Sequence, residues 1–114
     1  MPQLIIHAEN DGRARVKAEM VKALRTYMIE ALELKQEQGQ VFLYEALPIH
    51  RATANERKSI VFIEVKMIEG RSDERKQAFA KGVTDIVSHA LELEKSQVLC
   101  LFDEYSSKAY IGGK

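Results

Sequence analysis

Short apolar runs alternate with longer amphipathic stretches along this chain. Four runs of seven or eight residues, rich in β-branched and aromatic side chains, predict strands over residues 2–8, 41–48, 60–67 and 97–104. In the two longest intervals, apolar residues recur every three or four positions among charged ones, which predicts amphipathic helices. The expected buried stripes are Val16, Met20, Leu24, Tyr27, Ala31 and Leu34 in the first helix and Phe79, Val83, Ile86, Ala90 and Leu93 in the second.

The chain contains an internal repeat. Gly12-Arg13 opens the first helical stretch, which ends in Ala31-Leu32-Glu33-Leu34. Gly70-Arg71 opens the second, which ends in Ala90-Leu91-Glu92-Leu93. These anchors recur at offsets of 58 (70 − 12) and 59 (90 − 31) residues, and the glutamines before the following strands recur at 57 (97 − 40). A repeat of this size is one supersecondary unit, here strand-helix-strand.

The repeat predicts a single domain over residues 1–114, with repeat 1 at about 2–49 and repeat 2 at about 60–111. The order βαββαβ allows two architectures: one interleaves the strands in ferredoxin-like fashion, and the other keeps each βαβ unit intact and joins the units side by side. A tandem repeat favours the second. We therefore expect an α+β fold with a four-stranded mixed sheet and two helices on one face.

The strands also suggest self-assembly. Two helices cover only one face of a four-stranded sheet, so the other face should alternate to polar residues if it meets water. Leu4 to Ile6, Val61 to Ile63 and Val98 to Phe102 are instead apolar at consecutive positions. An apolar face of that size predicts an obligate homo-oligomer.

Composition excludes several function classes. Seventeen Lys and Arg against seventeen Asp and Glu give a net charge of zero, which removes the electrostatic basis for binding nucleic acid or an anionic membrane. No signal-peptide pattern and no membrane-length apolar run is present, so we expect a cytoplasmic protein. Cys100 lies in an apolar run and is expected to be a small buried hydrophobe. His7 and His50 have no ligand-like spacing, and no metal site is expected.

Pro2 is the first candidate for chemistry. If the initiator methionine is removed, the chain begins with a secondary amine whose reference pKa is about 7.7 to 8.0. Apolar surroundings and nearby cations would lower that pKa and leave a neutral general base. Alternatively, Pro2 merely begins an edge strand, where its missing N–H costs nothing.

Arg71 is the second candidate, because it lies just before a predicted helix. An arginine beside exposed helix N–H groups makes a carboxylate site. The alternative is a solvated arginine offset by Asp73 and Glu74. Arg13 follows a glycine in the first copy, as Arg71 does in the second, and we assign it the same place.

The run Glu69-Gly70-Arg71-Ser72-Asp73-Glu74-Arg75-Lys76, together with the closing Tyr110-Ile111-Gly112-Gly113, closely resembles the 4-oxalocrotonate tautomerase family. The resemblance covers Val61 to Lys114 well and Pro2 to Leu47 more loosely, through the repeat. The whole chain is similar to a fused pair of such subunits, as in the trimeric long members of the tautomerase superfamily that include macrophage migration inhibitory factor.

The resemblance implies a cofactor-free tautomerase or isomerase, assembled as a homotrimer, that moves a proton on a small 2-keto or 2-hydroxy-enol carboxylate. It gives Pro2 the role of general base or acid, and it makes Arg71 the residue that binds the carboxylate. Tyr110 falls near the aromatic residue that walls the family's site. Related outcomes are a hydratase, dehalogenase or decarboxylase with the same machinery, or a catalytically silent trimeric binding or signalling protein.

The chain departs from the family at two positions. Leu99 stands where the family has a second arginine, which argues against a dicarboxylate substrate. Val61 occupies the proline position of the second copy and is an internal amide, so the second pseudo-equivalent site should be inert. His50 and Arg51 are candidates to replace the missing arginine as substrate-binding residues.

Overall fold

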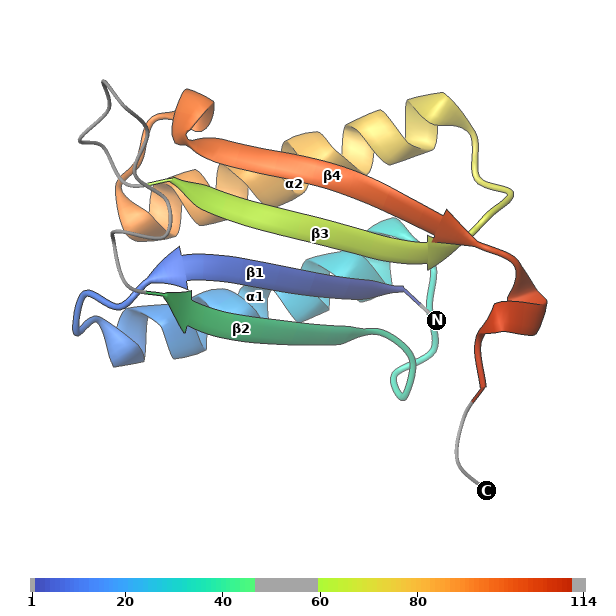
Figure 1. Ribbon diagram of the computed structural model, residues 1–114, viewed down its shortest axis with the longest axis horizontal. Coiled ribbons are helices and arrows are strands. Elements are labelled where there is room, and N and C mark those ends of the chain that lie inside the picture. The colour runs from blue at the N-terminus through green and yellow to red at the C-terminus, as the bar shows by residue number, and fades with distance from the viewer. Residues whose placement is uncertain (1, 47–59, 112–114) are drawn as a thin grey trace.

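The computed structural model describes residues 2–46 and 60–111. Its helices and strands follow the expected order (Figure 1). They are β1 (Gln3–Glu9), α1 (Ala14–Ala31), β2 (Gln40–Ala46), β3 (Val61–Ile68), α2 (Asp73–Leu91) and β4 (Val98–Tyr105), with short 3₁₀ helices at Lys95–Gln97 and Ser107–Ala109.

The sheet keeps each βαβ unit intact. Its strand order is β2-β1-β3-β4; β1 and β2 are parallel, β3 and β4 are parallel, and the two central strands β1 and β3 are antiparallel. Ile6 lies opposite Ile63 in this central pairing. Both helices cover the same face of the sheet (Figure 1). The fold class predicted from the repeat is therefore confirmed, and the interleaved ferredoxin-like alternative is excluded.

Alternation along the central strands places the core between sheet and helices. Every second residue is buried: Leu4, Ile6 and Ala8 on β1, and Val61, Ile63, Val65 and Met67 on β3. The helices complete the core with Met20, Leu24, Met28 and Leu32 from the first unit and Phe79, Val83, Val87 and Leu91 from the second.

The predicted stripe of the first helix was wrong at its start. Val16 is 37% exposed, whereas Lys17 is buried with 2% of its surface exposed. Burial of a lysine requires partners for its ammonium group. Glu9, Asp11 and Glu45 provide them, so the helix turns the lysine inward. Periodicity had counted Lys17 as a surface residue.

The two helices end alike and thereby define the offset between the copies. Glu33 and Glu92 both adopt the left-handed conformation with φ of 55°. Aligning these helix ends gives an offset of 59 residues (92 − 33). The offset pairs Lys17 with Lys76, and it pairs Arg13, the N-cap residue of α1, with the N-cap residue Ser72. Arg13 therefore does not occupy the place of Arg71, as we had expected.

The helices approach closely at one glycine. Tyr27 of α1 stacks on Phe79 of α2, with ring centroids 5.6 Å apart and planes within 3°. A Cβ atom at Gly82 would lie 2.0 Å from the Tyr27 hydroxyl oxygen. Glycine at this position makes the room that the tyrosine ring occupies.

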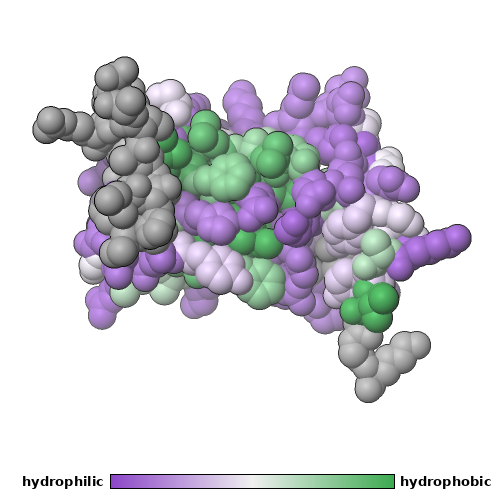
Figure 2. All heavy atoms as spheres, in the orientation of Figure 1, coloured by the Kyte–Doolittle hydropathy of each residue, from purple (hydrophilic) through white to green (hydrophobic). Residues whose placement is uncertain are grey.

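The face of the sheet away from the helices is partly apolar. Its four most exposed large side chains are those of Phe42, Tyr44, Leu99 and Leu101, which are 41%, 55%, 48% and 57% exposed. Figure 2 shows hydrophobic side chains gathered over the middle of this face. Such a surface exceeds what isolated exposed hydrophobic residues account for.

Charged groups interrupt that apolar surface. The Nε2 of His7 lies 2.8 Å from Glu64, and the imidazole stacks between the rings of Tyr44 and Phe62. Lys66 and Asp103 form a second pair on the same face. The prediction of a face that is apolar throughout was therefore wrong, since each central strand places a charged or titratable residue among the apolar ones.

Candidate active site

Pro2 and Arg71 line one pocket, although they come from opposite halves of the chain. The pocket lies at the edge of the sheet where β1 begins and β3 ends (Figure 1). Its volume is about 540 Å³, within the range of small-molecule sites. Its remaining lining residues are the apolar Leu32, Leu34 and Ile68, the polar Glu33, Gln38 and Glu69, and Gly70.

The central strand pairing brings these residues together. Gln3 lies opposite Lys66, so Pro2 lies beside the end of β3 and the loop that leads to α2. The carbonyl oxygen of Pro2 accepts a hydrogen bond from the backbone N–H of Gln40 at 3.2 Å, which fixes the start of β1 against β2. In the facing loop, Gly70 has a φ of +124°, a conformation that side chains rarely adopt.

The pocket combines an apolar wall with a single cation. Pro2 is buried, and Arg71 is partly exposed. Among the residues that the structure describes, Arg71 forms no ion pair, so its guanidinium is available to an anion. A carboxylate held by such a group beside apolar side chains gains a charge-assisted hydrogen bond. The geometry therefore suits a small carboxylic acid with an apolar portion.

A matching but filled pocket lies at the opposite end of the sheet. At the offset of 59 residues, Val61, Leu91 and Leu93 take the places of Pro2, Leu32 and Leu34. The volume of this second pocket is only about 20 Å³, little more than one water needs. Arg13 and Lys17 also line it.

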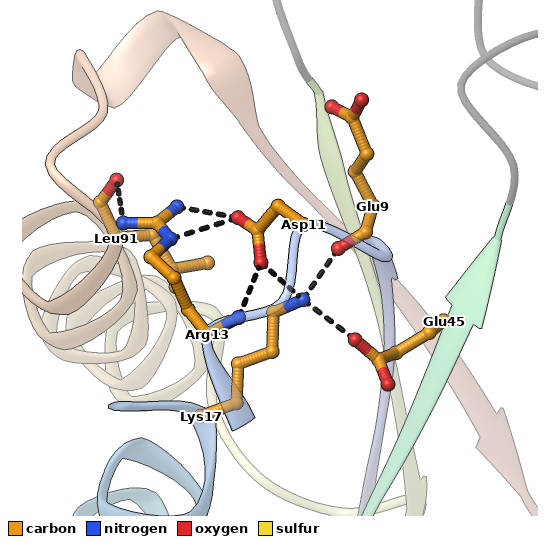
Figure 3. A network of polar contacts seen from close by, with 6 residues as sticks. All are labelled: Glu9, Asp11, Arg13, Lys17, Glu45 and Leu91. Atoms are coloured by element: carbon orange, nitrogen blue, oxygen red, sulfur yellow. Dashed lines mark hydrogen bonds and ion pairs between the residues drawn. The ribbon is translucent and has the colours of Figure 1, made fainter. Parts of the chain in front are cut away.

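Arg13, Lys17 and Asp11 form the polar network of this second pocket (Figure 3). The Arg13 guanidinium donates to the carbonyl oxygen of Leu91 at 3.2 Å and to Asp11 at 2.8 Å. The Lys17 Nζ lies 2.9 Å from Asp11 and 2.7 Å from Glu45, and it donates to the carbonyl oxygen of Glu9. The basic groups of the second pocket are thus already bound by the protein itself.

The network shifts the ionisation of its members. The hydrogen bond from Lys17, joined by those from Arg13, holds the pKa of Asp11 far below its ordinary value. Burial alone would lower the pKa of Lys17, but its hydrogen bonds to Glu45 and Asp11 outweigh that effect and raise the pKa above its ordinary value. Both groups are therefore charged at neutral pH.

The other residues named from the sequence are not among the lining residues of the Pro2 pocket. Tyr110 stacks on Tyr105 beyond the end of β4, with ring centroids 6.4 Å apart. Leu99 is exposed on the face away from the helices. His50 and Arg51 lie outside the described residues. Cys100 is half-buried, and burial raises the pKa of its thiol.

Sequence reasoning missed three polar residues of the pocket, Glu33, Gln38 and Glu69. One signal was available for Gln38, because Gln97 occupies its place in the second copy (97 − 38 = 59). An amide retained before the last strand of both units indicates a shared role in the turn. That role does not by itself indicate a pocket.

A larger open hollow of about 900 Å³ lies at the end of α2. Asp85 and Lys95, two of its lining residues, lie 3.0 Å apart and neutralise one another. Within residues 2–46 and 60–111 no group of three or more His, Cys, Asp or Glu side chains could hold a metal ion. Within the same residues, neither helix has the length and apolar character of a membrane span.

Comparison with known proteins agrees with the architecture and with the residues of the Pro2 pocket. The model of the tautomerase enzyme family matches residues 62–113. A probable tautomerase of Listeria innocua is 36% identical over 53 residues, which are 46% of this chain and 87% of that protein. The chain belongs to the tautomerase family. Its relatives are isomerases, and this chain is an isomerase of the same family.

Solved structures match the whole chain in fold. A wild-type fused 4-OT, described as a symmetric trimer, superposes with a TM-score of 0.85 at 20% identity over 93% of this chain and 87% of that one. Macrophage migration inhibitory factor of Toxoplasma gondii superposes with a TM-score of 0.84 at 13% identity over 97% of this chain and 96% of that one. The fused-repeat, MIF-like fold of this tautomerase is thereby confirmed.

Replacement of Asp11 by Asn should reduce the stability of this tautomerase at neutral pH and not at low pH. The carboxylate is partly exposed, so we expect a loss of about 1 kcal/mol. Because folding lowers the pKa of Asp11, its contribution is complete above the unfolded-state pKa near 4 and is lost as the pH falls below it. Urea unfolding of both proteins at several pH values between about 6 and 2 measures this difference.

Asp73→Asn is the matched control for this measurement. Asp73 also pairs with a lysine, Lys76, at 3.3 Å, but 87% of its side chain is exposed. We expect the control to change stability little at any pH. A constant difference between Asp11→Asn and the wild type across the whole pH range would contradict the assigned network.

Proposed function

We propose that this tautomerase moves a proton on a small 2-keto or 2-hydroxy-enol carboxylate, with Pro2 as the general base and acid. The observation that carries the proposal is the shared pocket, in which a buried proline and a free arginine lie against an apolar wall. No cofactor is needed for this reaction, because both the base and the anion-binding group belong to the chain.

The proton transfer needs one group that accepts and then returns the proton. After removal of Met1, the neutral nitrogen of Pro2 takes the proton from the enol hydroxyl of the substrate. The oxygen lone pair forms the C2=O bond, the C2=C3 electron pair moves to C3, and the proline ammonium delivers the proton to C3. Arg71 binds the carboxylate and stabilises the negative charge that develops on the substrate.

The charges around the pocket favour a monocarboxylate. Arg71 is the one cationic residue that lines it within the described part of the chain, whereas Glu33 and Glu69 supply two carboxylates. A second carboxylate on the substrate would approach like charges without a second cation to bind it. The position where the family has another arginine is Leu99, which lies on the other face of the sheet.

We also propose that each chain has one active site. The second pocket has Val61 in place of the proline, and Arg13 and Lys17 fill it. A backbone amide nitrogen is not basic, and the protein's own groups satisfy the cations there. The duplication therefore supplies one reactive and one structural copy of the same pocket.

A homotrimer is the assembly that we propose for this chain. Phe42, Tyr44, Leu99 and Leu101 leave apolar surface on the face away from the helices. The fused 4-OT that shares this fold is a symmetric trimer. Packing of that face against other copies would remove the apolar side chains from water.

The proline mechanism predicts a pH dependence of activity. The kcat/KM for phenylpyruvate tautomerisation should rise with pH as the Pro2 amine loses its proton. Its midpoint should lie below the amine's ordinary pKa of about 8, because the apolar wall and Arg71 disfavour the charged form. The carboxylates of Glu33 and Glu69 act in the opposite direction, but both are exposed to water, which weakens their effect.

Blocking the nitrogen tests the same mechanism directly. Protein that retains Met1, verified by mass spectrometry, has a tertiary amide at Pro2 and should be inactive although folded. Pro2→Gly leaves a primary amine and should retain partial activity. Full activity in protein with a blocked Pro2 would end the proline mechanism.

Arg71 and Arg13 should differ sharply when each is replaced by Ala. Arg71→Ala should lower kcat/KM by roughly 10- to 1000-fold, because a charge-assisted hydrogen bond contributes about 1.5 to 3 kcal/mol and more if it tightens in the transition state. Arg13→Ala should leave kcat/KM within about 2-fold and reduce stability instead. Steady-state kinetics and thermal unfolding of both variants measure these effects; equal losses of activity would show that the two pockets were assigned wrongly.

The proposed trimer predicts an elution and scattering mass of about three times 13.0 kDa. Leu101→Asp should shift the protein toward smaller species, because it places a charge in the proposed interface. Val16→Asp is the control: Val16 is also an exposed hydrophobic residue, but it lies on α1, away from that face. A wild-type monomer at micromolar concentration, measured by light scattering, would contradict the assembly.

A further inference from the structure

Gln38 has a hydrogen-bonding arrangement that the tautomerase reaction described above does not use. It lines the pocket of Pro2 and Arg71 at the turn between α1 and β2. Its Oε1 accepts a hydrogen bond from the backbone N–H of Lys35 at 3.0 Å. Because a backbone N–H can only donate, this contact identifies the oxygen of the amide and leaves Nε2 as the end available to the pocket.

Both the backbone and the side chain of Gln38 are held in place. Its own N–H donates to the carbonyl oxygen of Lys35 at 3.0 Å, which closes the turn. Gly39, which follows, has a φ of +83° and is so closely packed that a Cβ atom there would lie 2.9 Å from Met28 Cε. Arg25 donates to the carbonyl oxygen of Gly39 at 3.3 Å and to that of Gln36. The amide is therefore positioned before any ligand arrives.

The available donor has no other use within the described residues. The Nε2 of Gln38 has no hydrogen-bond partner there, and the residue is only partly exposed. Two residues further on, the N–H of Gln40 binds the carbonyl oxygen of Pro2. The turn that carries the amide is thus joined directly to the residue proposed as the base.

We propose that Gln38 Nε2 donates a hydrogen bond to the 2-oxo or enolate oxygen of the substrate, while Arg71 binds the carboxylate. This inference rests on the proposed function of the pocket. In the keto form the oxygen is an acceptor, and in the transition state it carries developing negative charge. A fixed neutral donor stabilises that charge without attracting a second carboxylate.

The second copy supplies a matched control. Gln97 occupies the same position in its unit, and its Oε1 accepts from the backbone N–H of Glu94 at 2.9 Å. Its own N–H also closes the turn, at 2.9 Å from the carbonyl oxygen of Glu94. Gln97 is not among the lining residues of the filled pocket. A role in the turn alone would therefore make the two glutamines equivalent.

The test compares Gln38→Glu with Gln97→Glu. Each change keeps an oxygen to accept the turn hydrogen bond and replaces the amide N–H donors with a carboxylate oxygen. We expect Gln38→Glu to lower kcat/KM for phenylpyruvate roughly 100-fold, the effect of losing one oxyanion donor. Gln97→Glu should stay within about 2-fold. Equal activity in the two variants, with equal melting temperatures, overturns the inference.

Two further measurements separate this inference from the proposed function. If Arg71→Ala and a blocked Pro2 abolish activity while Gln38→Glu does not, the proposed function stands and the role of Gln38 falls. If the wild type does not turn over phenylpyruvate, the side-chain amide signals in a ¹H–¹⁵N spectrum still decide. A shift of the Gln38 signal during phenylpyruvate titration, with the Gln97 signal unchanged, supports the contact, and the absence of such a shift overturns it.

Discussion

The antiparallel pairing of β1 with β3 determines where chemistry can occur in this protein. It places the start of each copy's first strand beside the end of the other copy's first strand. Pro2 thereby lies near the loop that carries Arg71, and Val61 lies near the loop that carries Arg13. A slip of two residues in this register would move the strands by roughly 7 Å relative to each other. Both pockets would then lose their facing loop.

The two ends of the sheet differ mainly through one carboxylate. Each unit has a lysine on its helix paired with a glutamate on its last strand, at 2.7 Å for Lys17 with Glu45 and 2.8 Å for Lys76 with Glu104. At the offset of 59 residues, however, Asp11 stands where the other copy has Gly70. The Asp11 carboxylate draws Arg13 and Lys17 together and closes its pocket. A glycine in that place provides no such anchor.

Much of the fold could be predicted because the copies support each other. Two weak strand-helix-strand patterns in the same order indicate intact βαβ units more strongly than either one alone. The phase of the first helix could not be read, because Lys17 is buried by contacts from three different segments. Arg13 was equated with Arg71 because both follow a glycine, although the helix starts differ from the dipeptides by one residue. Gln38 was missed because its turn contact and its pocket contact involve different ends of one amide.

The filled pocket changes what evolution can do with each half of the chain. A protein with two open pockets would expose both to selection for the reaction. Here a change at Val61 or Arg13 affects folding alone, whereas a change at Pro2 or Arg71 affects chemistry in a pocket that still holds its shape. One duplicated surface is thus free to drift toward rigidity while the other adapts to new substrates.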